Sequence, residues 1–334
     1  MTFILFFEQL LNGMQFGIML FLMSAGLTLI FGVMGLINLA HGSFYMIGAF
    51  CAALIAGLTG SFWLALLASL IGAAIAGVLI EIIIIRRLYR RDHLDQVLAT
   101  FALILLLSEG VRWIFGAFPL YLNIPNILNG SIPLFFDIIY SKYRLFIILI
   151  GFLIAAGLYL LITKTRLGIR IRAGQNDRQM ISALGVDISK LYTIVFAIGA
   201  SLAGLAGAMI GAIQSVEVGM GEPILILAFV VIVIGGIGSI KGALIGSILV
   251  GVTDTIGRIF LPELLKVFME SSNATSVGSS IGSMIIYILM AFILIIKPSG
   301  LFFPLIFWLQ ILPRILEASC KLASKNTLIS CIIN

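Results

Sequence analysis

Charged side chains are scarce in this chain of 334 residues, of which only 10% are Asp, Glu, Lys or Arg while 61% are hydrophobic. An ordinary soluble domain has about 25% charged residues and roughly 45–50% apolar ones. The few charges cannot form a polar shell around a buried core. The composition therefore excludes a conventional water-soluble protein and leaves the lipid bilayer as the solvent for most of the surface.

Cysteine is also scarce, and Cys51, Cys320 and Cys331 stand too far apart for a metal or redox motif, so we expect inert thiols. The sequence has no GxxxxGK[ST] phosphate loop, because GGIGSIKG carries its lysine at the wrong place. Asn38 and His41 are the only candidate catalytic pair, and no metal-spaced cluster accompanies them. We therefore expect no enzyme activity, no metal and no cofactor on this chain.

Long apolar runs fill nearly the whole sequence and predict an all-α, polytopic membrane bundle. About 20 apolar residues cross a bilayer as a helix, which satisfies its own backbone hydrogen bonds. We expect about nine crossings, with eight to ten allowed, because 44–58 is short and 224–260 is long enough for two but interrupted around Lys241. The clear runs are 10–31, 62–85, 97–115, 145–162, 191–213 and 279–296. No stretch remains for a soluble domain.

Arginine and lysine gather in two segments, 86–93 and 163–190, separated by two predicted crossings. Because basic residues concentrate in cytoplasmic loops, both segments are expected on the cytoplasmic side. Counting crossings from them places the N-terminus outside and the C-terminus inside. The first apolar run lacks a basic leader and a cleavage site, so it is expected to remain as a spanning helix.

The segment GLTLIFGVMGLINLAHGSFYMIGAF, residues 26–50, interrupts apolar sequence with glycines and polar groups. Polar groups at membrane depth usually face a cavity or a partner, and discontinuous helices expose backbone along translocation paths. The segment therefore predicts a broken or re-entrant helix beside such a path. The candidate residues are Gly32, Gly35, Asn38, His41 and Gly42. The alternative is that Asn38 and His41 only cap helices at the cytoplasmic interface.

The basic segment 165–192 has a second unusual pattern. The residues from Asn176 to Gly185 are typical of a short helix that begins at Asn176 or Asp177 and ends at Gly185, too polar to span. Such a helix on the cytoplasmic face is a docking element. The alternative is that Arg166, Arg170, Arg172 and Arg178 simply bind anionic lipid head groups.

The charges that fall inside apolar runs can neutralise one another. Glu109 and Arg112 stand at i,i+3, and Asp254 and Arg258 stand at i,i+4, so each pair can form on one helix face. Glu81 lies one turn from the arginines at 86–93 and can pair with them. Too few unpaired acids remain for a proton or sodium relay.

Four motifs in order resemble the permeases of branched-chain amino acid ABC transporters, the LivH/LivM type. GVMGLINLAHGSFYMIGAF resembles the family's N-terminal segment, and 166–192 followed by FAIGASLAGLAGAMIG resembles its cytoplasmic coupling loop and next helix. GGIGSIKGALIGSILVG and IIKPSGLF continue the match, which covers about residues 8–303. We expect a permease domain over 1–303 and a cytoplasmic or interfacial tail over 304–334.

The resemblance implies an inner-membrane subunit that forms the path for branched-chain or other small amino acids. Its implied partners are a second permease, either related or a second copy, a pair of cytoplasmic ATPase subunits that use the ATP, and an external solute-binding protein. The implied ATPase-coupling residues are Arg172, Asn176, Asp177, Arg178, Gln179 and Gly185.

This sequence departs from the family pattern at one coupling position. The family's Glu-Ala-Ala-like start is replaced by Gln179, Met180 and Ile181, so an acidic contact there is excluded. The alternatives for function are an ABC permease for urea or short amides, and a stand-alone secondary transporter or channel. The latter would need intramembrane ion-coupling groups.

Overall fold

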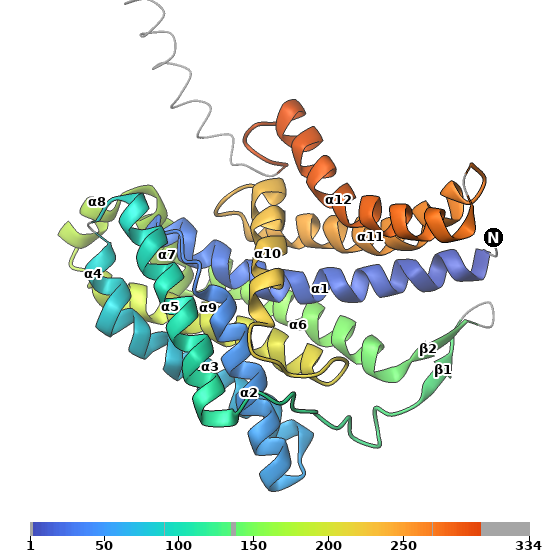
Figure 1. Cartoon of the computed structure of the whole chain (residues 1–334). Coiled ribbons are helices and arrows are strands. Elements are labelled where there is room, and N and C mark those ends of the chain that lie inside the picture. Colours follow the sequence, from blue (N-terminus) through green and yellow to red (C-terminus); the bar gives the residue numbers. More distant parts are fainter. Residues whose placement is uncertain (1–2, 90, 135–137, 269, 302–334) are drawn as a thin grey trace, which may run out of the picture.

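The computed structural model describes residues 3–89, 91–134, 138–268 and 270–301 (Figure 1). Within them the regular secondary structure is helical apart from one antiparallel hairpin, β1 (Ser131–Pro133) with β2 (Ile139–Ser141), and an isolated bridge between Leu120 and Val216. The helices are α1 (Phe3–Met34), α2 (His41–Thr59), α3 (Phe62–Ile80), the π-helical turn η1 (Glu81–Ile85), α4 (Arg86–Leu88), α5 (His93–Phe115), α6 (Lys142–Lys164), α7 (Arg166–Asn176), α8 (Arg178–Ala183), α9 (Ile188–Gly211), α10 (Gly221–Gly235), α11 (Ile240–Leu265) and α12 (Ser271–Ile296). The predicted tail, 304–334, lies outside the described residues.

Eight helices in the described ranges are long and apolar enough to cross a membrane, with α3, η1 and α4 counted as one. The shorter helix α10 is apolar too, but its 15 residues keep it outside this group. Val216, before α10, pairs with Leu120, and Gly238, after it, lies against Gly32 near the end of α1. The eight candidates fall within the range of eight to ten crossings that the sequence predicts.

The two ambiguous regions are resolved by helix boundaries. Residues 44–58 belong to α2, whose 19 residues are enough to span. Residues 224–260 divide between α10 and α11, and the break falls at Gly236–Ser239, within the predicted interruption. Gly236 and Gly238 both have positive φ there, a conformation that side chains disfavour.

The two ends of the bundle carry different segments. Figure 1 shows the N-terminus, the β1–β2 hairpin and the α11–α12 turn together, here called the hairpin end. The short helices α4, α7 and α8 lie at the opposite side, here called the arginine end. The two arginine-rich segments therefore share one end, as predicted from the sequence, and the N-terminus lies away from it.

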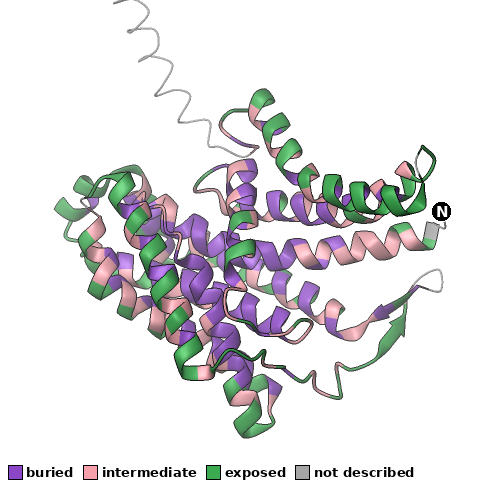
Figure 2. Ribbon diagram, in the orientation of Figure 1, coloured by how far each residue is buried: buried purple, intermediate pink, exposed green. Residues whose placement is uncertain are grey.

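The interior is built on α1 and α9, which are the most enclosed of the spanning helices, whereas α5 and α12 are largely exposed (Figure 2). Glycines allow the backbones to meet. A Cβ built on Gly48 of α2 would lie 2.2 Å from Gly204 of α9, and one on Gly17 of α1 would lie 2.7 Å from the Ser247 carbonyl of α11.

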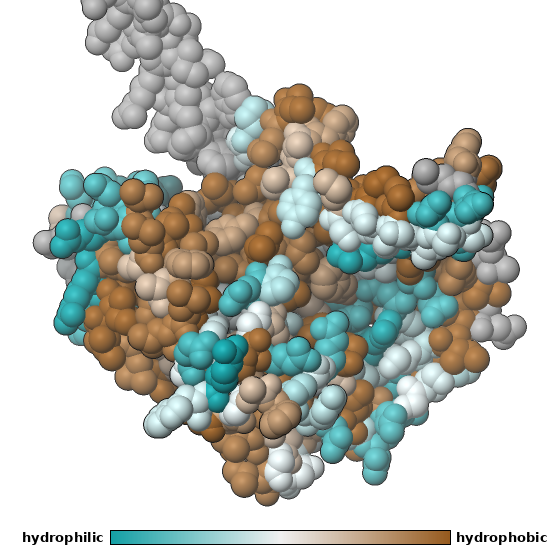
Figure 3. All heavy atoms as spheres, in the orientation of Figure 1, coloured by the Kyte–Doolittle hydropathy of each residue, from teal (hydrophilic) through white to brown (hydrophobic). Residues whose placement is uncertain are grey.

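Apolar side chains cover the outer surface over α3 and α5, and hydrophilic ones gather around α4 and α8 (Figure 3).

Candidate functional site

A sharp bend, here called the elbow, joins α1 to α2 through residues 35–40. Gly35 ends α1 with φ +63° while its N–H donates to the Phe31 carbonyl at 2.8 Å. Asn38 then closes the turn, since its Oδ1 accepts a hydrogen bond from the Ala40 N–H at 3.1 Å. The sequence prediction of a broken helix here is confirmed, whereas the N-cap of α2 is Ala40, which has no side-chain cap, so Asn38 stabilises the turn before the helix and does not cap it.

His41 begins α2 and is fully buried. Its ring meets Phe44 edge to face, with centroids 6.1 Å apart, and its Nε2 lies 3.0 Å from where a Cβ on Gly26 would stand. The ring lies near the Met23 carbonyl, yet within the described part of the chain neither nitrogen makes a hydrogen bond of normal geometry. The histidine is thus part of a packed crossing of α1 and α2, and its place beside a translocation path stays a prediction.

Gly42 brings the start of α2 against the start of α10. A Cβ on Gly42 would lie 2.7 Å from the Gly221 carbonyl oxygen, and one on Gly221 would be still closer to the Gly42 carbonyl. Neither position has room for a side chain. The elbow is therefore anchored to α10 as well as to α1.

The basic segment after α6 folds into two short helices instead of one. Thr165 caps α7, with its Oγ1 accepting from the Gly168 N–H at 3.1 Å. The buried residues Gly168, Ile171 and Gly174 form one face of α7. The opposite face carries exposed arginines, which is the amphipathic pattern of a helix lying on a protein surface.

The second helix, α8, has well-formed caps at both ends. Asp177 Oδ1 accepts from the N–H groups of Gln179 and Met180 at 2.9 and 3.0 Å. At the other end Gly185 has φ +83°, and the Val186 N–H reaches the Ile181 carbonyl at 3.3 Å, as in a Schellman motif. The prediction of a short helix ending at Gly185 is confirmed.

The outer side of α8 is exposed and partly apolar. Met180 and Leu184 are 65% and 76% exposed, while Ile181 is buried beneath them. Large apolar side chains at the polar end of a membrane protein favour contact with another protein. The implied coupling residues Asn176, Asp177, Gln179 and Gly185 are exposed in the same segment.

The structure brings the two predicted regions into contact. A Cβ on Gly32 would lie 2.6 Å from Gln175 Nε2 at the end of α7, and a Cβ on Gly35 would lie 2.7 Å from Arg178 Nη2 at the start of α8. Asn38, His41 and Gly42 lie deeper and do not take part. The ends of α7 and α8 that face each other therefore lie beside the end of α1 and the first residue of the elbow.

Sequence reasoning missed part of a polar network that fixes the arginine end. Glu81 is fully buried and pairs with Arg86 Nη2 at 3.0 Å, as predicted, but it also accepts from Tyr89 Oη at 2.9 Å and Thr193 Oγ1 at 2.8 Å. Burial, together with the Glu81 carboxylate, raises the pKa of the Tyr89 phenol well above its ordinary value, so it remains a donor. The π-helical turn η1 brings residues five apart onto one face.

The remaining predicted ion pairs form on their own helices. Arg112 Nη1 lies 2.8 Å from Glu109 Oε1, and Arg258 Nε lies 2.7 Å from Asp254 Oδ1. Arg172, an implied coupling residue, instead lines a cavity that also includes Lys241, a residue that the sequence marked only as an interruption. No pattern in the sequence predicts that Lys241 lines a cavity.

Known proteins match most of the chain. The profile of the family described as the branched-chain amino acid transport system permease component matches residues 9–294. The high-affinity branched-chain amino acid transport system permease protein BraD of Pseudomonas aeruginosa is 31% identical over 266 residues, 75% of this chain and 86% of the relative. The high-affinity branched-chain amino acid transport system permease protein LivH of Escherichia coli K12 is 29% identical over 278 residues, which cover 79% of this chain and 90% of the relative.

A further relative has a similar name and a similar coverage. The probable branched-chain amino acid transport permease protein LivH of Methanocaldococcus jannaschii is 28% identical over 295 residues, which cover 85% of this chain and 88% of the relative. The matches include the elbow, α7, α8 and the α10–α11 turn within one continuous profile. The chain is a multi-pass membrane protein that belongs to the branched-chain amino acid transport system permease family.

Proposed function

We propose that this chain is the permease subunit of an ATP-binding-cassette importer and forms part of the path for branched-chain or other small amino acids across the inner membrane. ATP is hydrolysed by a pair of separate cytoplasmic subunits, and this chain carries no cofactor. An external solute-binding protein delivers the substrate. The permease domain covers 1–303, followed by the tail 304–334.

The observation that carries the proposal is the contact of α8 with the elbow. An ATPase subunit that binds the exposed Met180 and Leu184 holds α8 from outside, while Arg178 holds Gly35 on the inner side. A short, doubly capped helix resists bending, so it moves as a unit. Movement of the ATPases then changes the angle between α1 and α2 and switches the side to which the path opens.

The orientation follows from the same assignment. The arginine end is cytoplasmic, because basic loops concentrate on that side and the ATP is there. The N-terminus and the β1–β2 hairpin face the exterior, where the solute-binding protein docks. The C-terminus is cytoplasmic, consistent with the Leu301 N–H that donates to the Ile234 carbonyl at the end of α10.

The second permease subunit, a related chain or a second copy, packs on α12. The exposed face of α12 carries hydroxyls of Ser272, Ser276, Ser279 and Ser280, which suit a close helix interface better than lipid chains. Figure 3 shows this face as a pale, hydrophilic band against brown surroundings. The path runs between the two subunits.

A stand-alone secondary transporter is less well supported, because its coupling ions need unpaired intramembrane charges. Glu81, Glu109 and Asp254 each pair with an arginine. The names of the relatives BraD and LivH favour branched-chain amino acids over urea or short amides as the substrate.

The first experiment tests ATPase docking. In the double variant Met180→Glu with Leu184→Glu, charges replace the apolar surface of α8, and we expect loss of ATPase co-purification and of ATP-dependent uptake. The matched control for ATPase co-purification is Val267→Glu with Phe268→Glu, two exposed apolar residues (79% and 77%) at the opposite, hairpin end, and this variant should still co-purify with the ATPase subunits. Normal ATPase binding and uptake by the α8 variant would contradict the docking assignment.

The second experiment distinguishes the transport classes and substrates. Proteoliposomes with the whole complex should accumulate labelled leucine only with internal ATP, and excess valine should compete while urea and acetamide should not. Concentrative uptake by the purified chain alone would support a secondary transporter instead. Competition by urea would move the substrate assignment to small amides.

A further inference from the structure

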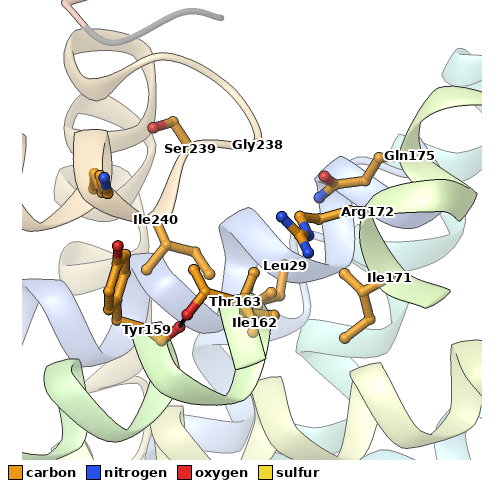
Figure 4. Close-up of a pocket in the computed structure, with 11 residues that line it drawn as sticks. Leu29, Tyr159, Ile162, Thr163, Ile171, Arg172, Gln175, Gly238, Ser239 and Ile240 are labelled. Carbon is orange, nitrogen blue, oxygen red and sulfur yellow. Dashed lines mark hydrogen bonds between the residues drawn. The ribbon is translucent and has the colours of Figure 1, made fainter. Parts of the chain in front are cut away.

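A cavity of about 170 Å³ opens at the arginine end between four elements (Figure 4). Tyr159 lines it from α6, Arg172 and Gln175 from α7, Leu29 from α1, Ser239 from the α10–α11 turn and Lys241 from the first turn of α11. Figure 4 shows Arg172 and Gln175 on one side and Ser239 on the other, with open space between them. The cavity is thus a junction of segments that are distant in sequence.

The charge in this cavity is entirely positive. Arg172 and Lys241 line it, no acidic residue does, and neither cation forms an ion pair within residues 3–89, 91–134, 138–268 and 270–301. Lys241 Nζ lies over the Tyr159 ring, 5.1 Å from its centroid, which holds the ammonium at the cavity edge. Two cations that line one cavity without a counter-charge favour an anionic ligand.

Hydrogen-bond donors add to the charge. Ser239 Oγ accepts from the Gly242 N–H at 3.0 Å, so its own proton is free to donate. Ser239 is also the N-cap of α11, a helix of 26 residues. The first N–H groups of a helix have no carbonyl acceptor within that helix. The positive end of the α11 dipole therefore points toward the same space as the two cations.

The cavity lies at the height where the apolar surface of α6 ends. Leu153 and Leu160 of α6 are 66% and 54% exposed, and Lys164 closes the helix a turn later. Tyr159 stands at this boundary, where aromatic residues commonly meet lipid head groups. The remaining walls, Leu29, Ile162, Ile171 and Ile240, are apolar.

We propose that this cavity binds the phosphate of an anionic phospholipid in the cytoplasmic leaflet. Arg172 and Lys241 contact the phosphate from opposite elements, the Ser239 hydroxyl donates to it, and an acyl chain lies along the exposed leucines of α6. Basic pockets between spanning helices on the cytoplasmic side bind anionic head groups by this chemistry. Inorganic phosphate carries a similar charge, but it has no acyl chain that would pack on the exposed apolar surface of α6.

Binding would tie α6, α7 and the α10–α11 turn together. Gln175, which lines the cavity, also lies against Gly32 of α1, so the site adjoins the contact between α7 and the elbow. The assignment of the leaflet rests on the proposed orientation, but binding of the lipid does not depend on the transport function.

The experiment measures lipid binding to the full chain in detergent by native mass spectrometry, with phosphatidylglycerol and phosphatidylcholine as probes. We expect phosphatidylglycerol to bind preferentially, and Arg172→Gln and Lys241→Gln each to weaken it about fivefold, which corresponds to about 1 kcal/mol. The matched controls are Lys190→Gln and Lys266→Gln, exposed cations that already pair with Asp187 and Glu263. Equal binding of both lipids, or unchanged phosphatidylglycerol binding when Arg172→Gln and Lys241→Gln are combined in one chain, would overturn the proposal.

Further measurements distinguish lipid binding from binding of a free anion or of a protein, and one of them uses the unmodified chain so that misfolding of a variant cannot affect the result. Titration with inorganic phosphate should show no saturable binding that depends on Arg172; such binding would make the cavity a free-anion site. Loss of ATPase co-purification in the glutamine variants, with lipid binding unchanged, would make it a protein contact. In the unmodified chain, a photoreactive phosphatidylglycerol should label peptides from α6 or α11, and labelling elsewhere only would contradict the site.

Discussion

The Arg178 guanidinium lies against Gly35, so close that a Cβ built on the glycine would stand 2.7 Å from Nη2. Gly35 also has φ +63°, which ends α1. One glycine therefore both turns the chain and receives the first residue of α8. The predictions below test this contact and the elements that support it.

Replacing Gly35 by alanine should impair transport more than stability. The left-handed backbone costs a side chain about 1–2 kcal/mol, and the new methyl group would also push Arg178 away. The measurements are thermal unfolding in detergent and ATP-driven uptake.

Gly60→Ala is the matched control for this variant. Gly60 has a similar φ of +66°, but no atom lies within 4 Å of its Cβ position. Both variants should lose similar stability, and only Gly35→Ala should lose uptake. Equal uptake by the two variants would refute a specific role for the Gly35 contact.

Arg178→Ala should uncouple ATP hydrolysis from uptake. The substitution leaves the apolar outer surface of α8 intact, so ATPase subunits should still bind, but the link from α8 to the elbow is removed. We expect uptake per ATP hydrolysed to fall several-fold, consistent with coupling changes of about 0.5–2 kcal/mol. Arg170→Ala, an exposed residue of α7, should keep the normal ratio. An unchanged ratio in Arg178→Ala would exclude this route of coupling.

Asp177→Ala should loosen α8 without unfolding the bundle. Loss of an N-cap costs about 1 kcal/mol, so the Gln179 and Met180 amides should exchange hydrogen about fivefold faster. Asp187 caps α9 in the same way, with Oδ1 accepting from the Lys190 N–H at 3.2 Å, a bond that lowers the pKa of its carboxyl. Asp187→Ala should change exchange at Lys190 only. Identical exchange profiles for the two variants would contradict separate caps.

Glu81→Gln should destabilise the arginine end, because Arg86, Tyr89 and Thr193 lose a charged acceptor that is fully buried. We expect a cost of about 2 kcal/mol or more, measured by thermal unfolding. Glu109→Gln breaks a pair whose side chains are 52% and 66% exposed, and it should cost less than about 1 kcal/mol. Similar costs at the two positions would show that the buried network contributes little.

Local features were predictable because they depend on neighbouring residues. Composition and apolar length predicted the bundle, glycines predicted the breaks at Gly35 and Gly238, and the polar pattern before Gly185 predicted α8. The same local rules found the Asp254–Arg258 pair, since i,i+4 residues share a helix face.

Contacts between distant segments were not predictable in this way. No pattern in one sequence joins Gly35 to Arg178, or Glu81 to Thr193, because these contacts depend on how whole helices cross. Lys241 shows the same limit: its sequence context identifies a helix break, but its position beside Arg172 depends on the packing of α6 and α7 around that break.

The brevity of α10 affects the thickness of the barrier. Its 15 residues rise about 22 Å, whereas the hydrocarbon core of a bilayer is about 30 Å thick. Non-helical backbone on either side of it therefore lies at membrane depth, where it must be enclosed by protein or reached by water. Where water reaches that backbone, a solute beside α10 would be out of water for a shorter distance than the full hydrocarbon thickness, which lowers the electrostatic cost of moving charged groups past this helix.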